Sequence, residues 1–509
     1  MHSGILVYDH ASARKRYAFM RVSKRVKNIM SRLLLLFFIV SLCWALDSTL
    51  TETPIRNDAR QNLWAAYNLY THGIFSTVIT SGKPSVDNDR EPLVPFATSL
   101  LVRFYKKSDV ALAFEDFSTG KMCRAVKQIN LYWAFFLLVG STMLILDLTG
   151  STLFAALSTA LIWLCFLSNP EHLDTICTEI PTATIMVWVS VVLARSLRSG
   201  RHLLFFSAGL LFGFLCLTKA VFLYLAFPIV LMIFLWNLIN SSANKIRAVS
   251  TGVLFMVAIA AVVGPWMLRN YSHFGSFNLT LRGGSVLYGR TLRNTMNMDE
   301  VVAAFYVWGP GAYKKMVANT FLEMNPEDYE EGGRAARLNR SADAAFERSD
   351  KIAQEAGRPQ DAVSFYRQST AEIVRLKRYY TALGHPSPQQ AADEYLKNEA
   401  KRWLFENPVR HVLMTVPFAW RGVWCFYGGG IFTVLNAICY STFMMLALYV
   451  FFRPRGDIVA FVLLPVCMLF FNAFLTHNII RYSTPAIPHL IISLLVMISI
   501  ISGRGVKKT

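Results

Sequence analysis

The chain has 509 residues, of which 54% are hydrophobic, and a formal net charge of +19 at pH 7. This apolar fraction is too high for a soluble protein of this length, and the apolar residues come in long blocks. A block of about 20 apolar residues spans a bilayer core, and inside lipid it must be helical because the backbone finds no water to bond. The composition therefore predicts an all-α polytopic membrane protein.

The positive charge indicates the topology of the chain. Basic residues precede the first apolar block and fill short loops between later blocks, which should be cytoplasmic by the positive-inside rule. Nucleic-acid binding would need a basic face on a soluble domain. None is evident, so we expect no nucleic-acid partner. The later basic positions are Arg195, Arg198, Arg201, Lys245, Arg247, Arg453 and Arg455, and in the tail Arg504, Lys507 and Lys508.

Ten apolar blocks are candidate spans, and ten spans place both termini on the inside. The first block, Leu33 to Leu46, lacks a small-residue cleavage site, so we expect a retained anchor. The segment Val409–Tyr427 is also apolar, but an eleventh span would put the later basic loops on the wrong side. We interpret it as an interfacial helix on the outer face. The ten blocks lie near 31–50, 125–147, 151–169, 176–195, 202–218, 220–240, 247–266, 430–452, 458–476 and 484–502.

This topology predicts three parts. Residues 1–270 form an N-terminal transmembrane module, with residues 47–124 as its first external loop. Residues 271–408 form an external, mainly helical domain, and residues 409–509 hold the interfacial helix and the C-terminal spans.

The external domain contains three predicted helices and one predicted turn. The helices cover Ala335–Ala356, Gln360–Leu383 and a segment from Ser387-Pro388 to Asn407-Pro408. The last one opens with Ser and then Pro, which is a standard helix start. Gly283-Gly284 lacks the strand–helix context of a nucleotide-binding loop, so we interpret it as a turn.

The most informative residue is Asp58, which lies just outside the first span. A general base must reach the proton that it removes and needs a suitable pKa. A partly desolvated carboxylate at the membrane face is expected to have a raised pKa. The alternative is an N-cap, because Asp58 precedes a plausible interfacial helix and Asp is a favoured cap. The two roles do not exclude each other.

Other charged residues lie at outer ends of spans. Glu179 opens the fourth span, where it could be functional or simply favoured by the helix dipole. Lys219, Arg269 and Arg481 are cations on the side that the positive-inside rule disfavours. They either snorkel to the interface or share a phosphate, which guanidinium and ammonium groups bind strongly. His477 could act as an acid or base, although a lone His near a span more often packs or hydrogen-bonds.

Several motifs resemble those of the GT-C membrane glycosyltransferases. The similar branch uses polyprenyl-phosphate sugars and includes the family 39 enzymes, the protein O-mannosyltransferases and the aminoarabinose transferase of lipid A. The motifs that carry the resemblance are Asp58 followed by a helix ending at Gly73-Ile-Phe75, Glu91-Pro-Leu-Val-Pro95, Glu179, Pro265-Trp-Met-Leu-Arg-Asn-Tyr to Gly275, Asn407-Pro408, and Arg481-Tyr-Ser-Thr-Pro485. Asp58 is followed by Ala59, where the commonest pattern has a second acid.

The resemblance implies a GT-C-like bundle of about ten transmembrane helices and an inverting transfer of sugar to a hydroxyl. Asp58 would be the general base, and Glu179 would orient the acceptor or assist. The donor phosphate would be bound by Lys219, Arg269, Arg481 and Tyr482, and further substrate contacts would come from Arg90, Glu91 and His477. The implied partners are a polyprenyl-phosphate sugar donor, membrane lipid, and a glycan, lipid or protein acceptor. The resemblance implies no metal or cofactor, and it implies a bacterial inner-membrane enzyme whose site faces outward.

Two alternatives remain at the level of sequence. A transporter or flippase for lipid-linked glycans should show charged or broken helices near the bilayer midplane, and often paired repeats. A polysaccharide polymerase or ligase would also use a lipid-linked donor at an outer site with basic and acidic residues. The Pro-Trp element and the position of the charges at outer span ends favour the transferase.

Overall fold

The computed structural model describes residues 10–78, 82–105, 113–120, 122–240, 245–320 and 322–503, which form helices and loops with no strand among them. Eight helices are long and apolar enough to cross a membrane. This confirms the predicted class, an all-α multi-span membrane protein. The eight are Ile29–Asp47 of α1 (His10–Asp47), Met122–Thr149 (α5, Met122–Lys127, and α6, Ile129–Thr149), α9 (Glu179–Ser199), Val221–Ile239 of α11 (Val221–Asn240), α12 (Lys245–Phe274), α20 (Ile431–Phe452), α21 (Gly456–Leu475), and Ile480–Ile501 (α22, Ile480–Ser483, η6, Thr484–Ala486, and α23, Ile487–Ile501).

Two shorter apolar helices occupy the remaining predicted blocks. They are α7 (Thr152–Ile162), which continues into the π-helical η1 (Trp163–Leu167), and α10 (His202–Thr218). The predicted interfacial segment forms α19 (Pro408–Val423), a 16-residue helix with Pro417 inside it. All ten predicted blocks are therefore helical, and α19 is not among the candidate spans.

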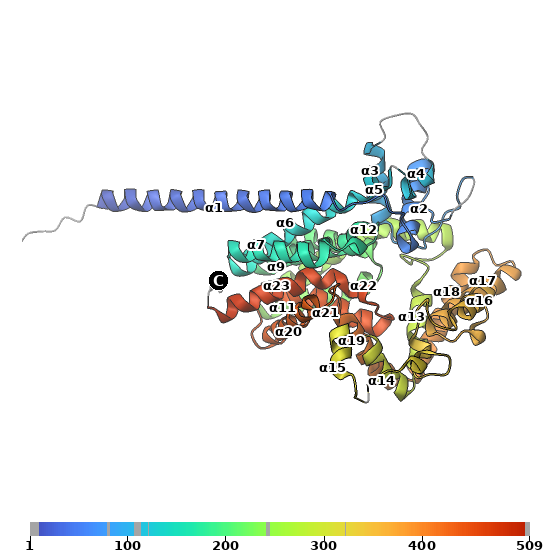
Figure 1. Cartoon of the computed structure of the whole chain (residues 1–509). Coiled ribbons are helices and arrows are strands. Elements are labelled where there is room, and N and C mark those ends of the chain that lie inside the picture. The colour runs from blue at the N-terminus through green and yellow to red at the C-terminus, as the bar shows by residue number, and fades with distance from the viewer. Residues whose placement is uncertain are drawn as a thin grey trace, which may run out of the picture.

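The spanning helices and α7 run side by side, and α2, α4, α16, α17 and α18 lie toward one end of the bundle (Figure 1). The start of α1 and the end of α23 lie toward the opposite end. The tail residues Arg504, Lys507 and Lys508, which supported the predicted topology, lie outside the described residues.

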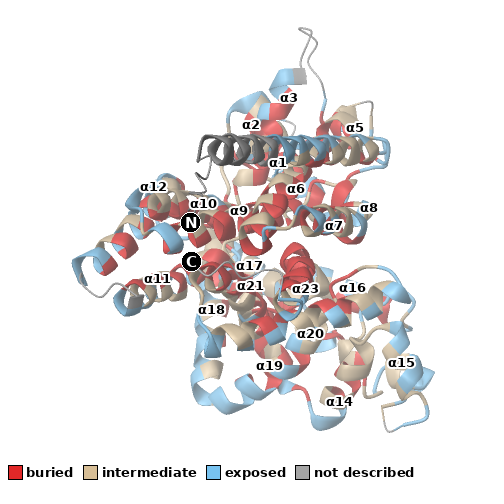
Figure 2. Ribbon diagram, turned by 90° about the vertical axis from the view of Figure 1, so that its left-hand side faces the viewer, coloured by how far each residue is buried: buried red, intermediate tan, exposed pale blue. Residues whose placement is uncertain are grey.

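Buried residues concentrate where the bundle helices face one another (Figure 2). The largest buried cluster runs through α1, α6, α9, α10, α12, α21 and α23. The outward faces of α11, α12 and α20 expose large apolar side chains, among them Leu235, Val253 and Val434. An exposed apolar belt around helices with internally bonded backbones is the surface that lipid requires.

Four short helices cover one end of the bundle: α2 (Asn57–His72), α3 (Leu93–Tyr105), α4 (Phe114–Ser118) and α5. The amphipathic α2 buries Leu63 and Trp64, and the Trp64 ring stacks on Phe114 with 3.4 Å between ring centroids. Gly73 ends α2 in the left-handed conformation with φ of 67°, and its N–H bonds to the carbonyl of Asn68. That conformation favours glycine because a Cβ would clash. This packing fixes the first turn of α2, which carries Asp58.

A second helical region packs against α19 and α21. A small apolar cluster joins Met296 and Phe365 to Met414, Phe418 and Ala473. Its helices are α13 (Gly283–Leu292), η2 (Arg293–Thr295), α14 (Met298–Val307), α15 (Gly311–Val317), η3 (Pro326–Tyr329), η4 (Ala336–Leu338), α16 (Glu347–Ala356), η5 (Pro359–Asp361), α17 (Phe365–Ala382) and α18 (Pro388–Glu406).

Two local predictions in this region are wrong. The helix expected over Ala335–Ala356 is regular only from Glu347, because Asn339 and Ser341 side chains accept from the backbone N–H groups of Ser341 and Asp343. Such local bonds compete with helix formation.

Gly283-Gly284, predicted as a turn, opens α13 instead. The carboxylate of Asp393 accepts from the backbone N–H groups of Gly284, at 2.9 Å, and Ser285, at 2.7 Å. It therefore supplies the bonds that the first turn of a helix lacks. Residue 284 has to be a glycine here, because a Cβ would lie 1.9 Å from the Asp393 carbonyl oxygen.

Candidate active site

Asp58 lies in the first turn of α2 and binds two guanidinium groups. One carboxylate oxygen accepts from Arg90, and the other accepts from Arg481 at 2.5 Å. Arg90 is itself held by Gln61, whose side-chain oxygen is 2.7 Å from its Nε. The predicted N-cap role is wrong, because Arg56 is the N-cap residue of α2 and Asp58 is inside the helix. Asp58 instead joins α2 to the start of the last span.

The same contacts decide the charge of Asp58. Burial raises the pKa of this carboxyl, but the positive charges and hydrogen bonds of Arg90 and Arg481 outweigh burial and hold it well below its usual value. The expectation of a raised pKa is therefore wrong, since it omitted the two guanidinium partners. The Asp58 side chain is still 37% exposed, so a substrate hydroxyl can reach it.

Glu179, at the start of α9, is the buried centre of the site. Its side chain is only 1% exposed, and its Oε1 lies 3.0 Å from Arg481 Nε and 3.8 Å from Lys219 Nζ. Neither Glu179 oxygen, nor Lys219 Nζ, has a hydrogen-bond partner among the described residues. The groups are thus close enough to attract one another and still have unused hydrogen-bonding capacity. We call these five residues, Asp58, Arg90, Glu179, Lys219 and Arg481, the mixed-charge cluster.

Three further predicted residues lie beside this cluster. Glu91 Oε1 accepts from the backbone N–H of Ala220, at 3.2 Å, which places it next to Lys219. The Tyr482 ring lies 5.7 Å from Lys219 Nζ and 5.4 Å from the His477 ring. Burial, together with nearby arginines, holds the pKa of His477 well below its usual value, so its imidazole is neutral at physiological pH.

Arg269 is not part of the mixed-charge cluster. Its guanidinium donates to the carbonyls of Asp87, at 2.8 Å, and Phe75, at 3.3 Å, and it stacks on Trp266 at 4.6 Å. These contacts fasten the segment after α2 to the end of α12. The structure therefore brings together Lys219 and Arg481 of the three predicted cations, and gives Arg269 a local role at the loop.

The sequence interpretation missed an ion pair that supports the site. Lys127, with no exposed side-chain surface, lies 2.9 Å from Asp174 Oδ1 and donates to the carbonyls of Thr51 and Thr53. The pair ties the chain entering α2 to the chain entering α9, so it positions both Asp58 and Glu179. The position of Lys127 inside an apolar block was the sequence signal that could have revealed this ion pair.

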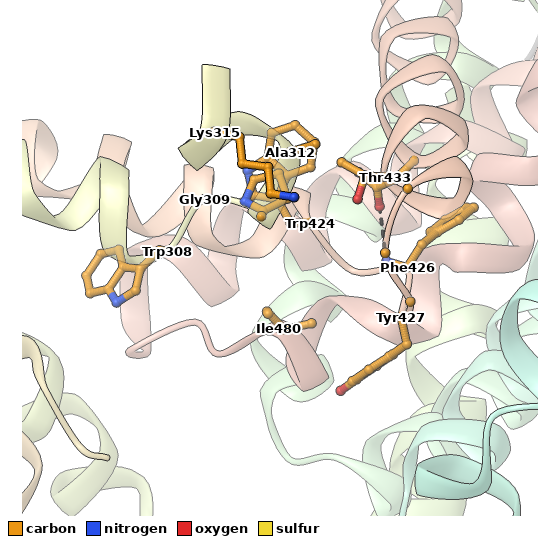
Figure 3. Close-up of a pocket in the computed structure, with 15 residues that line it drawn as sticks. Trp308, Gly309, Ala312, Lys315, Trp424, Phe426, Tyr427, Thr433 and Ile480 are labelled. Carbon is orange, nitrogen blue, oxygen red and sulfur yellow. Dashed lines mark hydrogen bonds between the residues drawn. The ribbon is translucent and has the colours of Figure 1, made fainter. Parts of the chain in front are cut away.

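A pocket of about 510 Å³ has Ile480, the residue before Arg481, in its wall (Figure 3). Aromatic side chains of Trp308, Trp424 and Tyr427 line it, with Lys315 at one side. The indole N–H of Trp424 is buried without a hydrogen-bond partner in the described structure. Binding pockets for small ligands fall between about 300 and 1,000 Å³ and combine apolar walls with a few polar groups.

Within the described residues, no group of three or more His, Cys, Asp or Glu side chains could hold a metal ion.

No family model matches the sequence, and no curated protein matches it. Solved structures similar to it include the oligosaccharyltransferase AglB of the archaeon Archaeoglobus fulgidus with an inhibitory peptide and a dolichol-phosphate, at a TM-score of 0.46 and 13% identity, covering 92% of this chain and 50% of that one.

Two other structures of the A. fulgidus oligosaccharyltransferase, with zinc and sulfate and in the apo form, also align at TM-scores of 0.46 and 12% identity, covering 92% and 94% of this chain. The chain spans about half the length of these proteins, 50% and 52% respectively. At TM-scores below 0.5 the similarity carries no argument about chemistry.

Proposed function

We propose that the chain transfers a sugar from a polyprenyl-phosphate-linked donor to a hydroxyl of an extracytoplasmic glycan, lipid or protein acceptor, with inversion at the anomeric carbon. The observation that carries the proposal is the mixed-charge cluster. It sets an accessible carboxylate, Asp58, beside two cations, Lys219 and Arg481, that retain capacity to bind an anion. The motif resemblance, read with this geometry, supports a membrane glycosyltransferase.

In the proposed reaction, Asp58 accepts the proton of the acceptor hydroxyl. The acceptor oxygen attacks the anomeric carbon from the face opposite the phosphate, and the bond between that carbon and the phosphate oxygen breaks. The polyprenyl phosphate leaves with the bonding electrons. Lys219 and Arg481 stabilise its growing negative charge, the kind of preorganised electrostatic term that often dominates catalysis. The proton therefore goes to Asp58, and the electrons of the broken bond go to the leaving phosphate.

The resting contacts of Asp58 suggest how the base is activated. Two guanidinium groups make the carboxylate a poor proton acceptor. A donor phosphate would compete for Arg481, and the loss of that contact would raise the pKa of Asp58. A general base works best when its pKa is near the operating pH. Donor binding would thus prepare Asp58 before the acceptor reacts.

The location of the site follows from the topology. The mixed-charge cluster lies at the end of the bundle where α2 and α16–α18 lie, opposite the start of α1 (Figure 1). With the basic loops inside, that end faces outward. We therefore propose a bacterial inner-membrane enzyme with its site at the periplasmic face.

The test is Asp58→Asn, which keeps the shape of the side chain and removes the base. We expect transfer to fall by about 10²–10⁴-fold, the usual contribution of a general base. Binding of polyprenyl phosphate to the purified variant should be retained. Transfer is read by mass spectrometry of membrane glycolipids and glycans from cells that lack the gene and carry either form.

Asp361→Asn is the matched control, since Asp361 is an exposed carboxylate paired with Arg358 in the helical region. It should restore the glycan profile as the unchanged chain does. Full transfer by Asp58→Asn would exclude the base assignment. A transporter would instead move a lipid-linked glycan across proteoliposomes without chemical change, in both forms alike.

A further inference from the structure

A second group of charges lies next to the mixed-charge cluster and differs from it in composition. It consists of Arg293 in η2, Arg340 after η4, and Arg421 in α19, which we call the arginine cluster. None of the three forms an ion pair with a carboxylate among the described residues. The group therefore carries three positive charges without a fixed negative partner.

The local contacts of the three arginines are to neutral groups. Arg293 is buried and donates to the carbonyl of Gly289. Arg421 donates to the carbonyl of His477, at 3.1 Å, and its guanidinium carbon lies 4.8 Å from the Trp308 ring centroid. The Arg340 guanidinium stacks 3.6 Å from the ring centroid of Tyr366. Aromatic faces and carbonyls orient these groups but do not neutralise them.

The three arginines lie around one apolar cluster, which contains Phe365 and Trp308. Arg293 lies 5.9 Å from the Phe365 ring, Arg340 stacks on the next residue, Tyr366, and Arg421 stacks on Trp308. Burial, with the charges of Arg421 and Arg340, lowers the pKa of Arg293 to about 9. Burial and the charge of Arg340, partly offset by Tyr482, lower the pKa of Arg421 to about 10. Both remain protonated at neutral pH, since arginine does not give up its charge in proteins. Their positive charges are thus held together in a site where they repel.

Other arginines of the same region have carboxylate partners. Arg334 pairs with Asp328 at 2.8 Å, Arg337 with Glu300 at 3.4 Å, and Arg367 with Glu347. Arg290, fully buried, donates instead to several neutral acceptors and stacks 4.2 Å from Phe418. These four arginines are thus paired with carboxylates or hydrogen-bonded to several neutral acceptors, which distinguishes them from the three arginines of the cluster.

The arginine cluster adjoins the proposed donor site. Arg421 bonds to the His477 carbonyl, the His477 ring packs on Tyr482, and the Tyr482 ring faces Lys219 of the mixed-charge cluster. Tyr482 therefore lies between the two groups of cations. A ligand that reaches Lys219 and Arg481 with one anionic group can present another to the arginine cluster.

We propose that Arg293, Arg340 and Arg421 form a second anion-binding site, which takes a phosphate or carboxylate group of the substrate. Guanidinium groups bind such anions with paired, charge-assisted hydrogen bonds. The anion has two possible sources, the second phosphate of a donor that carries a diphosphate in place of the proposed monophosphate, or an acidic group of the acceptor. The site requires no sugar transfer, so its existence is independent of the proposed reaction.

The first experiment measures binding of inorganic phosphate to the full-length protein in nanodiscs of neutral lipid, by calorimetry. Arg340→Gln and Arg421→Gln each remove one charge, and we expect each to weaken phosphate binding at this site by about tenfold, the effect of about one charge-assisted hydrogen bond. Arg402→Gln is the matched control, because Arg402 is exposed on α18 and pairs with Glu399. It should bind phosphate as the unchanged chain does.

Arg340 is exposed, so Arg340→Gln tests the site without threatening the fold. Phosphate binding that is unchanged in both Arg340→Gln and Arg421→Gln would overturn the proposal. Lys219→Gln should weaken only the other phosphate-binding event, which separates the two sites. If Asp58→Asn loses sugar transfer as expected but the arginine variants bind phosphate like the unchanged chain, the second anion-binding site is refuted and the proposed transfer reaction stands.

The second experiment assigns the source of the anion, using polyprenyl phosphate and polyprenyl diphosphate in the same nanodiscs. If the anion belongs to the donor, the diphosphate should bind more tightly, and Arg340→Gln should remove that advantage. If it belongs to the acceptor, the two lipids should bind alike, and Arg340→Gln should affect free phosphate only. Both results support an anion site and differ in what delivers the anion.

Discussion

The two ends of helix α9 carry charged residues that are partnered in different ways. In its last turns, Arg195 donates to Asp147 at 2.7 Å and Arg198 to Asp457 at 3.1 Å, and Asp457 also accepts from Arg455 at 2.8 Å. In its first turn, Glu179 lies between Lys219 and Arg481, and neither of its oxygens makes a hydrogen bond among the described residues. One end is a set of completed ion pairs, and the other is an incomplete network.

The difference supports the proposal that the Glu179 end of α9 is the end that binds substrate. Buried polar groups in proteins are nearly always hydrogen-bonded, so a specific exception needs an explanation. The completed ion pairs near Arg195 connect α6, α9 and α21, and this structural role accounts for them. The donors Lys219 Nζ and Arg481 Nε, which are buried without a hydrogen-bond partner among the described residues, are groups that an anionic ligand could accept from, while Glu179 attracts both cations and so holds them in place.

Of the changes that compare the two ends of α9, the largest effect should follow from Glu179→Gln, which removes the negative charge between the two cations. We expect transfer to fall by on the order of 10²-fold, the usual cost when supporting groups shift by about 1 Å. Lys219 and Arg481 would lose the carboxylate that positions them, and Arg481 would turn further toward Asp58. The measurement is the glycan profile of cells carrying the variant.

Protein yield and melting temperature accompany that assay, because an unpaired buried charge also destabilises a fold. A variant that folds normally and transfers sugar as well as the unchanged chain would remove Glu179 from the site. Wild-type transfer would also mean that the incomplete network has no functional meaning.

Most of the fold could be predicted from the sequence, because the membrane constrains it strongly. Ten apolar blocks predicted ten helical segments, and each of them is helical. The errors lie in the polar region, where local bonds decide the outcome. The side chains of Asn339 and Ser341 accept hydrogen bonds from nearby backbone N–H groups and so prevent a helix there. Asp393, more than a hundred residues along the chain, accepts from the backbone of Gly284 and so allows a helix to begin at the Gly283-Gly284 pair.

The composition of the site was predictable, but its pairing was not. Asp58, Glu179, Lys219 and Arg481 stood out because charge at a span end requires a reason. Their contacts depend on packing over long separations, with 423 residues between Asp58 and Arg481. Considered without its partners, Asp58 was predicted to have a raised pKa, whereas Arg90 and Arg481 lower its pKa. Arg269 had the same sequence signal as Lys219 and Arg481 and serves the loop instead.

A smaller effect is expected on the pH profile of Arg90→Gln. Asp58 has a folded-state pKa below its unfolded value of about 3.9, so its contribution to stability is present above that pH and is lost as the pH falls through the folded pKa. Removing Arg90 raises the pKa of Asp58. The acidic limb of kcat/KM, and the onset of acid unfolding, should both move to higher pH.

Arg103→Gln is the control for this shift, since Arg103 lies on α3, which packs against α2, and its one hydrogen-bond acceptor within the described residues is the carbonyl of Leu69. Its pH profile should match that of the unchanged chain. Equal acidic limbs in all three proteins would show that the Arg90 contact does not set the charge of Asp58 during turnover.

The smallest effect is expected at the completed end of α9. Asp147→Asn removes the partner of Arg195 in a pair whose side chains are 23% and 39% exposed. Partly exposed pairs contribute about 0–1 kcal/mol, so the free energy of unfolding should fall by no more than that. Transfer should be unchanged, because a helix of 21 residues places Arg195 more than 20 Å from Glu179 at about 1.5 Å per residue. Melting curves and the glycan profile test both statements. Asp147→Asn could instead lose as much transfer as Glu179→Gln at unchanged stability. The two ends of α9 would then not differ in function, and complete ion pairing would not distinguish the structural contacts of this bundle from its proposed binding site.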